Sequence, residues 1–184
     1  QAVFRFILKI TGAKITVIGE ENVPKDTPVL YIGNHRSYFD ILLTYSRCPI
    51  RTGYIAKKDG ENSSSFHMDA LSPLSFLDRK DIKQGLKTIL TAVDKVKSGI
   101  SICIFPEGTR NRNKDELDML PFHEGSFKIA TKPNARSSNC DQQFSQHFRG
   151  TLPEDYLLPK VVVEYGKPDL IRMNEQKKIR AMSE

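Results

Sequence analysis

A histidine and an aspartate lie five positions apart in the segment 34–40, directly after an apolar run at 29–32. An aspartate that accepts a hydrogen bond from one imidazole nitrogen leaves the other nitrogen able to take a proton, and it stabilises the imidazolium that forms. The ordinary pKa of an imidazole, ~6.5, keeps the neutral form available at neutral pH. His35 and Asp40 are therefore candidates for a general base and the residue that orients it. Taken alone, the same spacing also fits a purely structural turn.

A second segment, Phe105–Arg110, follows another apolar run and joins a turn, a carboxylate, a glycine and a guanidinium. The Arg110 guanidinium can hold a phosphate through two parallel hydrogen bonds. Gly108 allows close backbone approach or a positive φ, and Thr109 offers a hydroxyl. Glu107 can pair with Arg110, hold the turn or bind a substrate hydroxyl. In isolation, such a turn also fits a salt-bridged surface loop.

A third element is the segment 76–79, which ends in Arg79 just ahead of an amphipathic helix. Arg79 either supplies a second cation for the same anion or pairs with a neighbouring aspartate on the surface. No serine or cysteine stands out as a nucleophile, because Ser37 is better suited to shaping the turn or capping the next helix. The pattern therefore predicts direct attack by a hydroxyl of a phosphorylated substrate, whose proton His35 removes.

The 184 residues carry a net charge of +6, with 39% hydrophobic and 27% charged residues, a length that predicts one domain with a sizeable core. The excess of basic residues fits either a solvated surface or an anionic partner, such as acidic lipid headgroups or a phosphorylated metabolite. Nucleic acid is not expected, because helix-turn-helix, zinc-finger and RNP-like patterns are missing. Three widely spaced cysteines favour a reducing compartment and no zinc site. No apolar run reaches the ~18 residues that a membrane-spanning helix needs.

Strand-like and helix-like segments alternate, which predicts an α/β fold with a mixed central sheet flanked by helices. His35 then lies in a strand-to-helix loop at the carboxyl end of a strand, where open α/β sheets bind ligands. The segment 100–105 is almost wholly apolar, so we expect a central strand covered on both faces. Strands are expected at 15–18, 29–32, 100–105 and 161–165, and helices after Asp40, at 81–98 and at 172–180.

The amino-terminal residues 1–12 and two internal stretches need separate interpretation. Apolar residues fall at helical spacing from Gln1 to Ile10 with basic residues between them. This pattern fits packing against the core and a membrane-surface helix equally well. The start at Gln1 instead of a methionine fits a fragment of a longer chain. Residues 60–75 and 133–152 are polar and weakly periodic, which is atypical for loops in a compact domain.

In combination, the motifs resemble those of the glycerolipid acyltransferase family. That family carries Asn-His-x4-Asp, Phe-hydrophobic-Asp-Arg and Phe-Pro-Glu-Gly-Thr-Arg in this order. Similarity covers most of the chain apart from the two polar stretches, which implies a single acyltransferase domain over residues 1–184 with a glycerol-3-phosphate acyltransferase-like fold. The matching segments are NHRSYFD (34–40), FLDR (76–79), FPEGTR (105–110), TVIGEENVPKD (16–26), DIKQGLKTIL (81–90), LPFHEGSFKIA (120–130) and VVVEYGKP (161–168).

The resemblance implies transfer of a fatty acyl group from an acyl-CoA or acyl-carrier-protein thioester to the free hydroxyl of lysophosphatidate (1-acyl-glycerol-3-phosphate), giving phosphatidate. By the same resemblance, His35 deprotonates the hydroxyl and Asp40 orients His35. No cofactor or metal is implied. Membrane lipids are the implied partners, the implied location is the cytoplasmic face of a membrane, and the oligomeric state is left open. The implied phosphate-binding residues are Arg79, Glu107, Gly108, Thr109 and Arg110.

Two departures from the family pattern bear on function. The family has an apolar strand where this chain has the polar residues 133–140, and an apolar helical stretch where it has DGENSSSFHMDA after the Ala-Lys-Lys run at 56–58. Loss of a central strand would expose the edges of its neighbours and thin the core. A fatty chain also needs an apolar groove. These departures motivate one alternative, a non-catalytic phosphate- or membrane-binding domain of the same fold. Within the family, the alternative is an acyltransferase acting on another lysophospholipid or on glycerol 3-phosphate.

Overall fold

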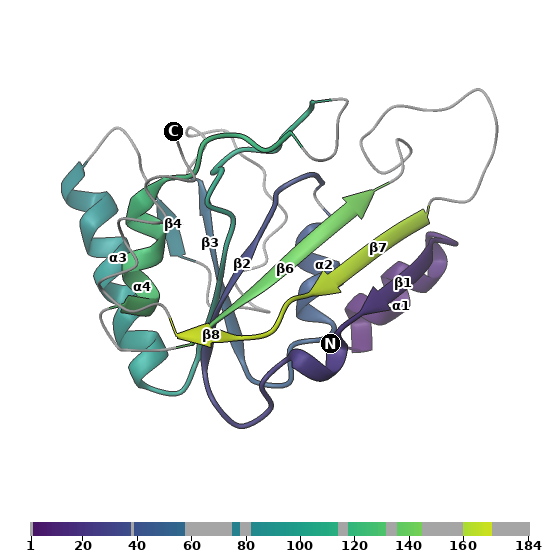
Figure 1. Cartoon of the computed structure of the whole chain (residues 1–184), viewed down its shortest axis with the longest axis horizontal. Coiled ribbons are helices and arrows are strands. Elements are labelled where there is room, and N and C mark those ends of the chain that lie inside the picture. Colours follow the sequence, from purple (N-terminus) through teal and green to yellow (C-terminus); the bar gives the residue numbers. More distant parts are fainter. Residues whose placement is uncertain are drawn as a thin grey trace.

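A twisted sheet with helices on both faces organises the chain (Figure 1). The computed structural model describes residues 2–37, 39–57, 75–77, 82–113, 118–131, 136–144 and 160–170. In spatial order the strands of the sheet are β1 (Lys14–Ile18), β7 (Lys160–Tyr165), β6 (Arg136–Phe144), β2 (Val29–Gly33), β5 (Ser101–Ile104), β3 (Thr52–Lys57) and β4 (Ser75–Leu77), with β8 (Asp169–Leu170) paired to β6.

The sheet is mixed, which confirms the predicted α/β fold with a mixed central sheet. β2 pairs in parallel with both β5 and β6, β3 pairs in parallel with β5 and β4, and β1 pairs in parallel with β7. β6 runs antiparallel to β7 and β8. The carboxyl ends of β2 and β5 consequently lie side by side at one edge of the sheet, which is where the two motif loops begin.

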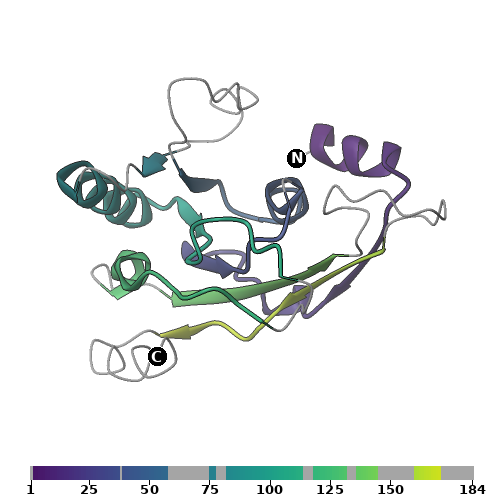
Figure 2. The ribbon, with the colours of Figure 1, turned by 90° about the horizontal axis from the view of Figure 1, so that it is seen from above.

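Helices cover the sheet in two layers, as Figure 2 shows. The helices α1 (Ala2–Ile10) and α2 (Asp40–Tyr45) lie on one face, and α3 (Ile82–Lys97) and α4 (Lys128–Thr131) lie on the other. Successive residues of a strand point to opposite faces. Tyr31 and Cys103 therefore pack on the α1–α2 side, whereas Leu30 and Ile104 pack on the α3 side.

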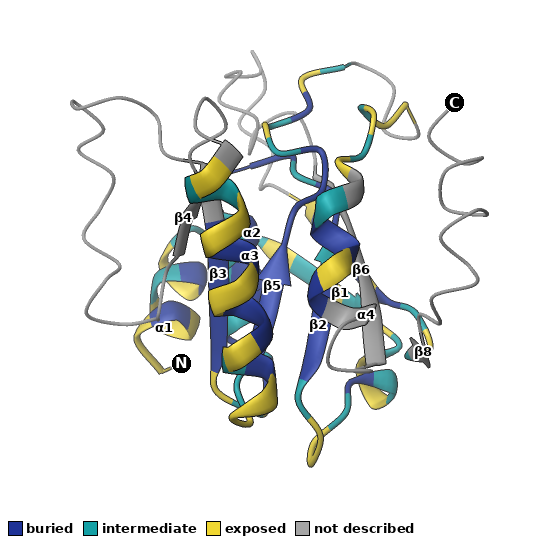
Figure 3. Ribbon diagram, turned by 90° about the vertical axis from the view of Figure 1, so that its left-hand side faces the viewer, coloured by how far each residue is buried: buried dark blue, intermediate teal, exposed yellow. Residues whose placement is uncertain are grey.

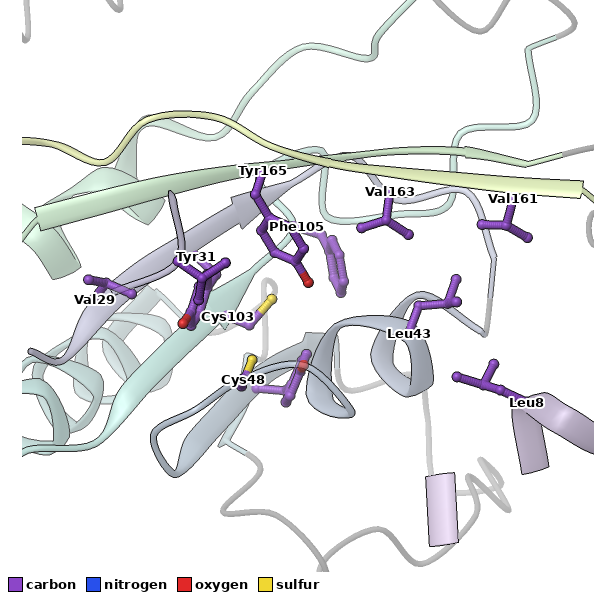
Figure 4. Close-up of a cluster of buried hydrophobic side chains, with 12 residues drawn as sticks. Leu8, Val29, Tyr31, Leu43, Cys48, Cys103, Phe105, Val161, Val163 and Tyr165 are labelled. Atoms are coloured by element: carbon purple, nitrogen blue, oxygen red, sulfur yellow. The ribbon is translucent and has the colours of Figure 1, made fainter. Parts of the chain in front are cut away.

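Each face has its own apolar cluster, and Figure 4 shows the one beneath α1 and α2. There Leu8 and Leu43 from the helices meet Val161, Val163 and other strand residues. In Figure 3, β2 and β5 are largely buried, with only Ile32 of these two strands half-buried, which fits the almost wholly apolar sequences of these central strands.

The helix α3 shows how the sequence pattern produces a buried stripe. Ile89, Ala92, Val93 and Val96 recur at three- and four-residue steps and are buried, while the opposite side faces solvent (Figure 3). Gly99, with φ of 92°, ends the helix: its N–H donates to Val96 O and the next N–H donates to the carbonyl five residues back. This is a Schellman cap, which satisfies carbonyls at the helix end.

The predicted strands at 15–18, 29–32, 100–105 and 161–165 are confirmed as β1, β2, β5 and β7. The predicted helices at the amino terminus, after Asp40 and at 81–98 are confirmed as α1, α2 and α3. The strands β3 and β4 were not predicted. Residues 60–74, 145–152 and the predicted helix at 172–180 lie outside the described residues.

The expectation that residues 133–140 leave the sheet without a strand is wrong. β6 begins at Arg136 and fills the place between β2 and β7, pairing in parallel with one and antiparallel with the other. Two neighbouring strand edges offer main-chain hydrogen bonds that do not depend on the side chains, so tertiary context overrides the weak strand propensity of a polar segment. The sheet is therefore continuous beneath the motif loops.

Candidate active site

The loop after β2 brings His35 and Asp40 into direct contact. β2 ends at Gly33, residues 34–37 form the loop, and Asp40 is the first residue of α2. His35 Nδ1 and Asp40 Oδ2 are 2.6 Å apart, and the Asp40 side chain is fully buried. The hydrogen bond that the sequence pattern suggested is thus present in the folded chain.

The Asp40 carboxylate also accepts main-chain hydrogen bonds from its own loop. The N–H of Arg36 donates to Oδ2 at 2.9 Å, and the N–H of Ser37 donates to both oxygens at 3.2 and 3.1 Å. Burial raises the pKa of Asp40, while the hydrogen bonds from His35, Ser37 and Arg36 act in the opposite direction. Because main-chain N–H groups can only donate, they favour the ionised carboxylate and hence the His35 tautomer with its proton on Nδ1. Nε2 then carries the lone pair.

The His35 ring and main chain are held by the segment that follows β5. The ring stacks on Phe105 with centroids 4.5 Å apart and an interplanar angle of 12°, and the side chain remains 20% exposed. The main-chain N–H of His35 donates to Glu107 Oε1 at 2.9 Å, and its carbonyl accepts from the N–H of Asn111 at 2.6 Å. The two motifs, far apart in sequence, therefore form one site at the carboxyl ends of β2 and β5.

The turn of the second motif divides into a buried and an open part. Glu107 is only 2% exposed, and its second oxygen accepts the N–H of Leu120 at 3.0 Å. Gly108 has φ of 65° and donates its N–H to Phe105 O at 2.9 Å, so the turn requires the conformation that glycine adopts without strain. Thr109 is exposed and Arg110 is half-buried. Arg79, the second predicted cation, lies outside the described residues.

Sequence reasoning missed two side chains that hold the loops together. Arg36 is 4% exposed and donates from Nη1 to the carbonyls of Asn111 and Asn113, at 3.5 and 3.2 Å. Asn111 is 1% exposed, and its Nδ2 donates to Asp118 O. In the sequence, the only indication that Arg36 and Asn111 hold the loops together was that they lie next to the motif residues.

A family model described as Acyltransferase matches residues 14–140. This range contains both motif loops and the sheet strands that position them. The chain belongs to the acyltransferase family. This agrees with the resemblance that the three motifs carry.

Several relatives of this chain have consistent names. A probable 1-acyl-sn-glycerol-3-phosphate acyltransferase of Mycoplasma pneumoniae is 30% identical over 138 residues, covering 71% of this chain and 50% of the relative. The 1-acyl-sn-glycerol-3-phosphate acyltransferase of Borreliella burgdorferi is 34% identical over 137 residues, covering 72% and 52%. The alpha form from Mus musculus is 30% identical over 169 residues, covering 86% and 58%. The chain thus spans about half the length of these curated relatives.

The fold of the chain also matches a solved structure. The crystal structure of the 1-acyl-sn-glycerophosphate (LPA) acyltransferase PlsC from Thermotoga maritima superimposes with a TM-score of 0.67 and 21% identity. The match covers 98% of this chain and 78% of that one. At this identity the likeness establishes the fold.

Within the described part of the chain, no group of three His, Cys, Asp or Glu side chains is placed to hold a metal ion. Among the described helices, none combines the length and apolar character needed to cross a bilayer.

Proposed function

We propose that this chain transfers a fatty acyl group from an acyl-CoA or acyl-carrier-protein thioester to the free hydroxyl of lysophosphatidate, giving phosphatidate. The observation that carries the proposal is the 2.6 Å contact between His35 Nδ1 and Asp40 Oδ2, which leaves Nε2 as a base at the carboxyl end of β2. The names of the relatives support the choice of acceptor. We further propose that residues 1–184 form one acyltransferase domain.

The reaction needs one proton to move twice. The lysophosphatidate hydroxyl gives its proton to His35 Nε2 while its oxygen attacks the thioester carbonyl carbon. Asp40 stabilises the imidazolium that forms. Collapse of the tetrahedral intermediate breaks the carbon–sulfur bond, and the departing thiolate takes the proton from Nε2. General-base help of this kind contributes ~10²–10⁴-fold in rate.

The open part of the Glu107–Arg110 turn is the proposed site for the glycerol phosphate. Arg110 supplies a guanidinium for two-pronged binding of phosphate oxygens, Thr109 offers an exposed hydroxyl, and the Gly108 backbone lets the ligand approach. Arg79 remains in the proposed set by its motif. Glu107 belongs to the same motif, but its buried carboxylate accepts hydrogen bonds from main-chain N–H groups.

The helix α1 supports a place on a membrane surface, at its cytoplasmic face by family resemblance. Phe4 and Leu8 are buried against the core, whereas Val3, Phe6 and Ile10 form a second apolar stripe that is 57%, 62% and 69% exposed. Positions 3, 6 and 10 lie on one side of a helix. The stripe can therefore insert at the boundary between the lipid headgroups and the acyl chains. One face of α1 thus packs against the core, and the other is available for the proposed contact with a membrane surface.

Vesicle binding tests the proposed membrane contact. The triple variant Val3→Ser, Phe6→Ser, Ile10→Ser should lose co-sedimentation with vesicles containing anionic phospholipid. The matched control is Leu86→Ser, Leu90→Ser, which changes two exposed leucines on α3, 54% and 41% exposed, and should bind like the wild type. Equal binding by the triple variant and the wild type would remove α1 from the membrane contact.

Thioester release with lysophosphatidate and a long-chain acyl-CoA tests the activity itself. The wild-type chain should release free thiol and form phosphatidate, and His35→Ala should reduce turnover by ~10²–10⁴-fold. Vesicle binding by a wild-type chain that shows no turnover with any lysophospholipid acceptor would instead support the non-catalytic binding domain. That alternative was motivated by the two polar segments, of which residues 136–144 form the strand β6.

A further inference from the structure

The carboxylate of Glu107 is engaged on both oxygens by main-chain donors. Oε1 accepts the N–H of His35 at 2.9 Å and Oε2 accepts the N–H of Leu120 at 3.0 Å, while the residue is 2% exposed. A buried carboxylate is tolerated where donors replace water, and these two amides do so. The side chain therefore joins three segments: the loop after β2, the turn after β5 and the segment around Leu120.

A direct contact between Glu107 and the substrate phosphate is electrostatically unfavourable. Both groups are anions, and their repulsion increases where water is excluded. The exposed atoms of the same motif lie at Thr109, two positions further on, whereas Glu107 is directed into the protein. The motif thus separates an outward part suited to an anion from an inward part suited to main-chain amides.

We propose that Glu107 is a positioning residue, which sets the place of the catalytic base through the main chain of His35 and does not bind the glycerol phosphate. The inference rests on the proposed role of His35. Three bonds fix His35: its N–H to Glu107, its carbonyl to the N–H of Asn111, and its ring Nδ1 to Asp40. Glu107 accepts the N–H of Leu120, and Asn111 donates from its side chain to the carbonyl of Asp118, so both residues that hold the main chain of His35 also bond to the segment 118–120.

Glu107→Gln is the sharpest variant because it keeps the shape of the side chain and removes one acceptor. Its amide NH₂ must face either the N–H of His35 or the N–H of Leu120, and two donors cannot bond to each other. A misplacement of about 1 Å at a reacting group costs ~10²-fold in rate. We expect kcat to fall by about this factor while KM for lysophosphatidate stays within about twofold. The matched control is Glu164→Gln, an exposed glutamate on β7, which should change neither.

A double-variant cycle separates positioning from a general structural effect. If Glu107 acts by placing the His35 side chain, Glu107→Gln should have no further effect on the residual turnover of His35→Ala. The melting temperature of each variant is measured alongside. Should Glu107→Gln not fold, Glu107→Asp replaces it, since it retains the charge but is one methylene too short to reach both amides.

The outcomes separate this inference from the proposed function. A rise in KM with unchanged kcat in Glu107→Gln, or an equal loss in the wild-type and His35→Ala backgrounds, would overturn the positioning role while leaving the general base intact. Full turnover in His35→Ala would instead overturn the proposed general-base role of His35, and the positioning role with it.

Discussion

The two halves of the site differ in how the protein treats their polar groups. In the half around His35, the Asp40 carboxylate is fully buried and accepts from a ring nitrogen and two main-chain N–H groups. In the half formed by Thr109 and Arg110, the side chains are exposed or half-buried. The base is held by bonds made before any substrate arrives, whereas the groups proposed to bind phosphate reach solvent.

This difference suggests a division of labour between the halves. Preorganised hydrogen bonds cost no reorganisation during the reaction, so the half around His35 is expected to determine kcat. A guanidinium that reaches the surface can form charged hydrogen bonds with a bound phosphate, so the turn is expected to determine KM. Substitutions in the two halves should therefore produce different kinetic signatures.

The largest effect is expected from Asp40→Asn. The amide keeps the size of the side chain but no longer stabilises an imidazolium, and kcat should fall by ~10³–10⁴-fold with little change in KM. Steady-state kinetics of thiol release measure both constants. Asp26→Asn, an exposed aspartate in the segment before β2, is the matched control and should behave as wild type. A kcat loss below tenfold would break the distinction between the two halves.

Arg110→Gln should give the opposite signature. Loss of a charged hydrogen-bonding group is worth roughly 1.5–3 kcal/mol, so KM for lysophosphatidate should rise by ~10–10²-fold while kcat changes little. Arg112→Gln removes an exposed arginine two positions along and should leave KM near the wild-type value. If kcat falls and KM does not change, Arg110 supports the base and the division between the halves is wrong.

A smaller effect is expected when pH is raised, which should lower the free energy of unfolding through Cys48 in the core below the site. Burial raises the pKa of Cys48 from 9.0 to about 11, and its thiol donates to Thr44 O at 3.2 Å. Between these pKa values the unfolded chain binds fewer protons than the folded chain, so stability falls as pH rises. The free energy of unfolding should be about 1 kcal/mol lower at pH 10 than at pH 8 because of this group.

Chemical unfolding at pH 8 and pH 10 measures this loss, and Cys48→Ala should show a loss smaller by about that amount. Equal losses in the two chains would mean that Cys48 does not link core stability to pH.

The sequence predicted the parts of the site that depend on local spacing. The His35–Asp40 pair falls within one loop and one helix start, so its contact follows from a few residues. The double role of Glu107 depends on Leu120, which reaches it only through the tertiary fold. The strand β6 was missed for the same reason, because its pairing comes from the neighbouring strands and not from its polar sequence.

The pH dependence of kcat/KM for phosphatidate formation tests the general base most directly. In the wild-type chain, log(kcat/KM) should rise with a slope of one on the acid side and then level off, because a single group must lose its proton. In His35→Gln the residual rate should be lower by ~10²–10⁴-fold, and this acid limb should be absent. An acid limb that persists unchanged in His35→Gln would contradict His35 as the base.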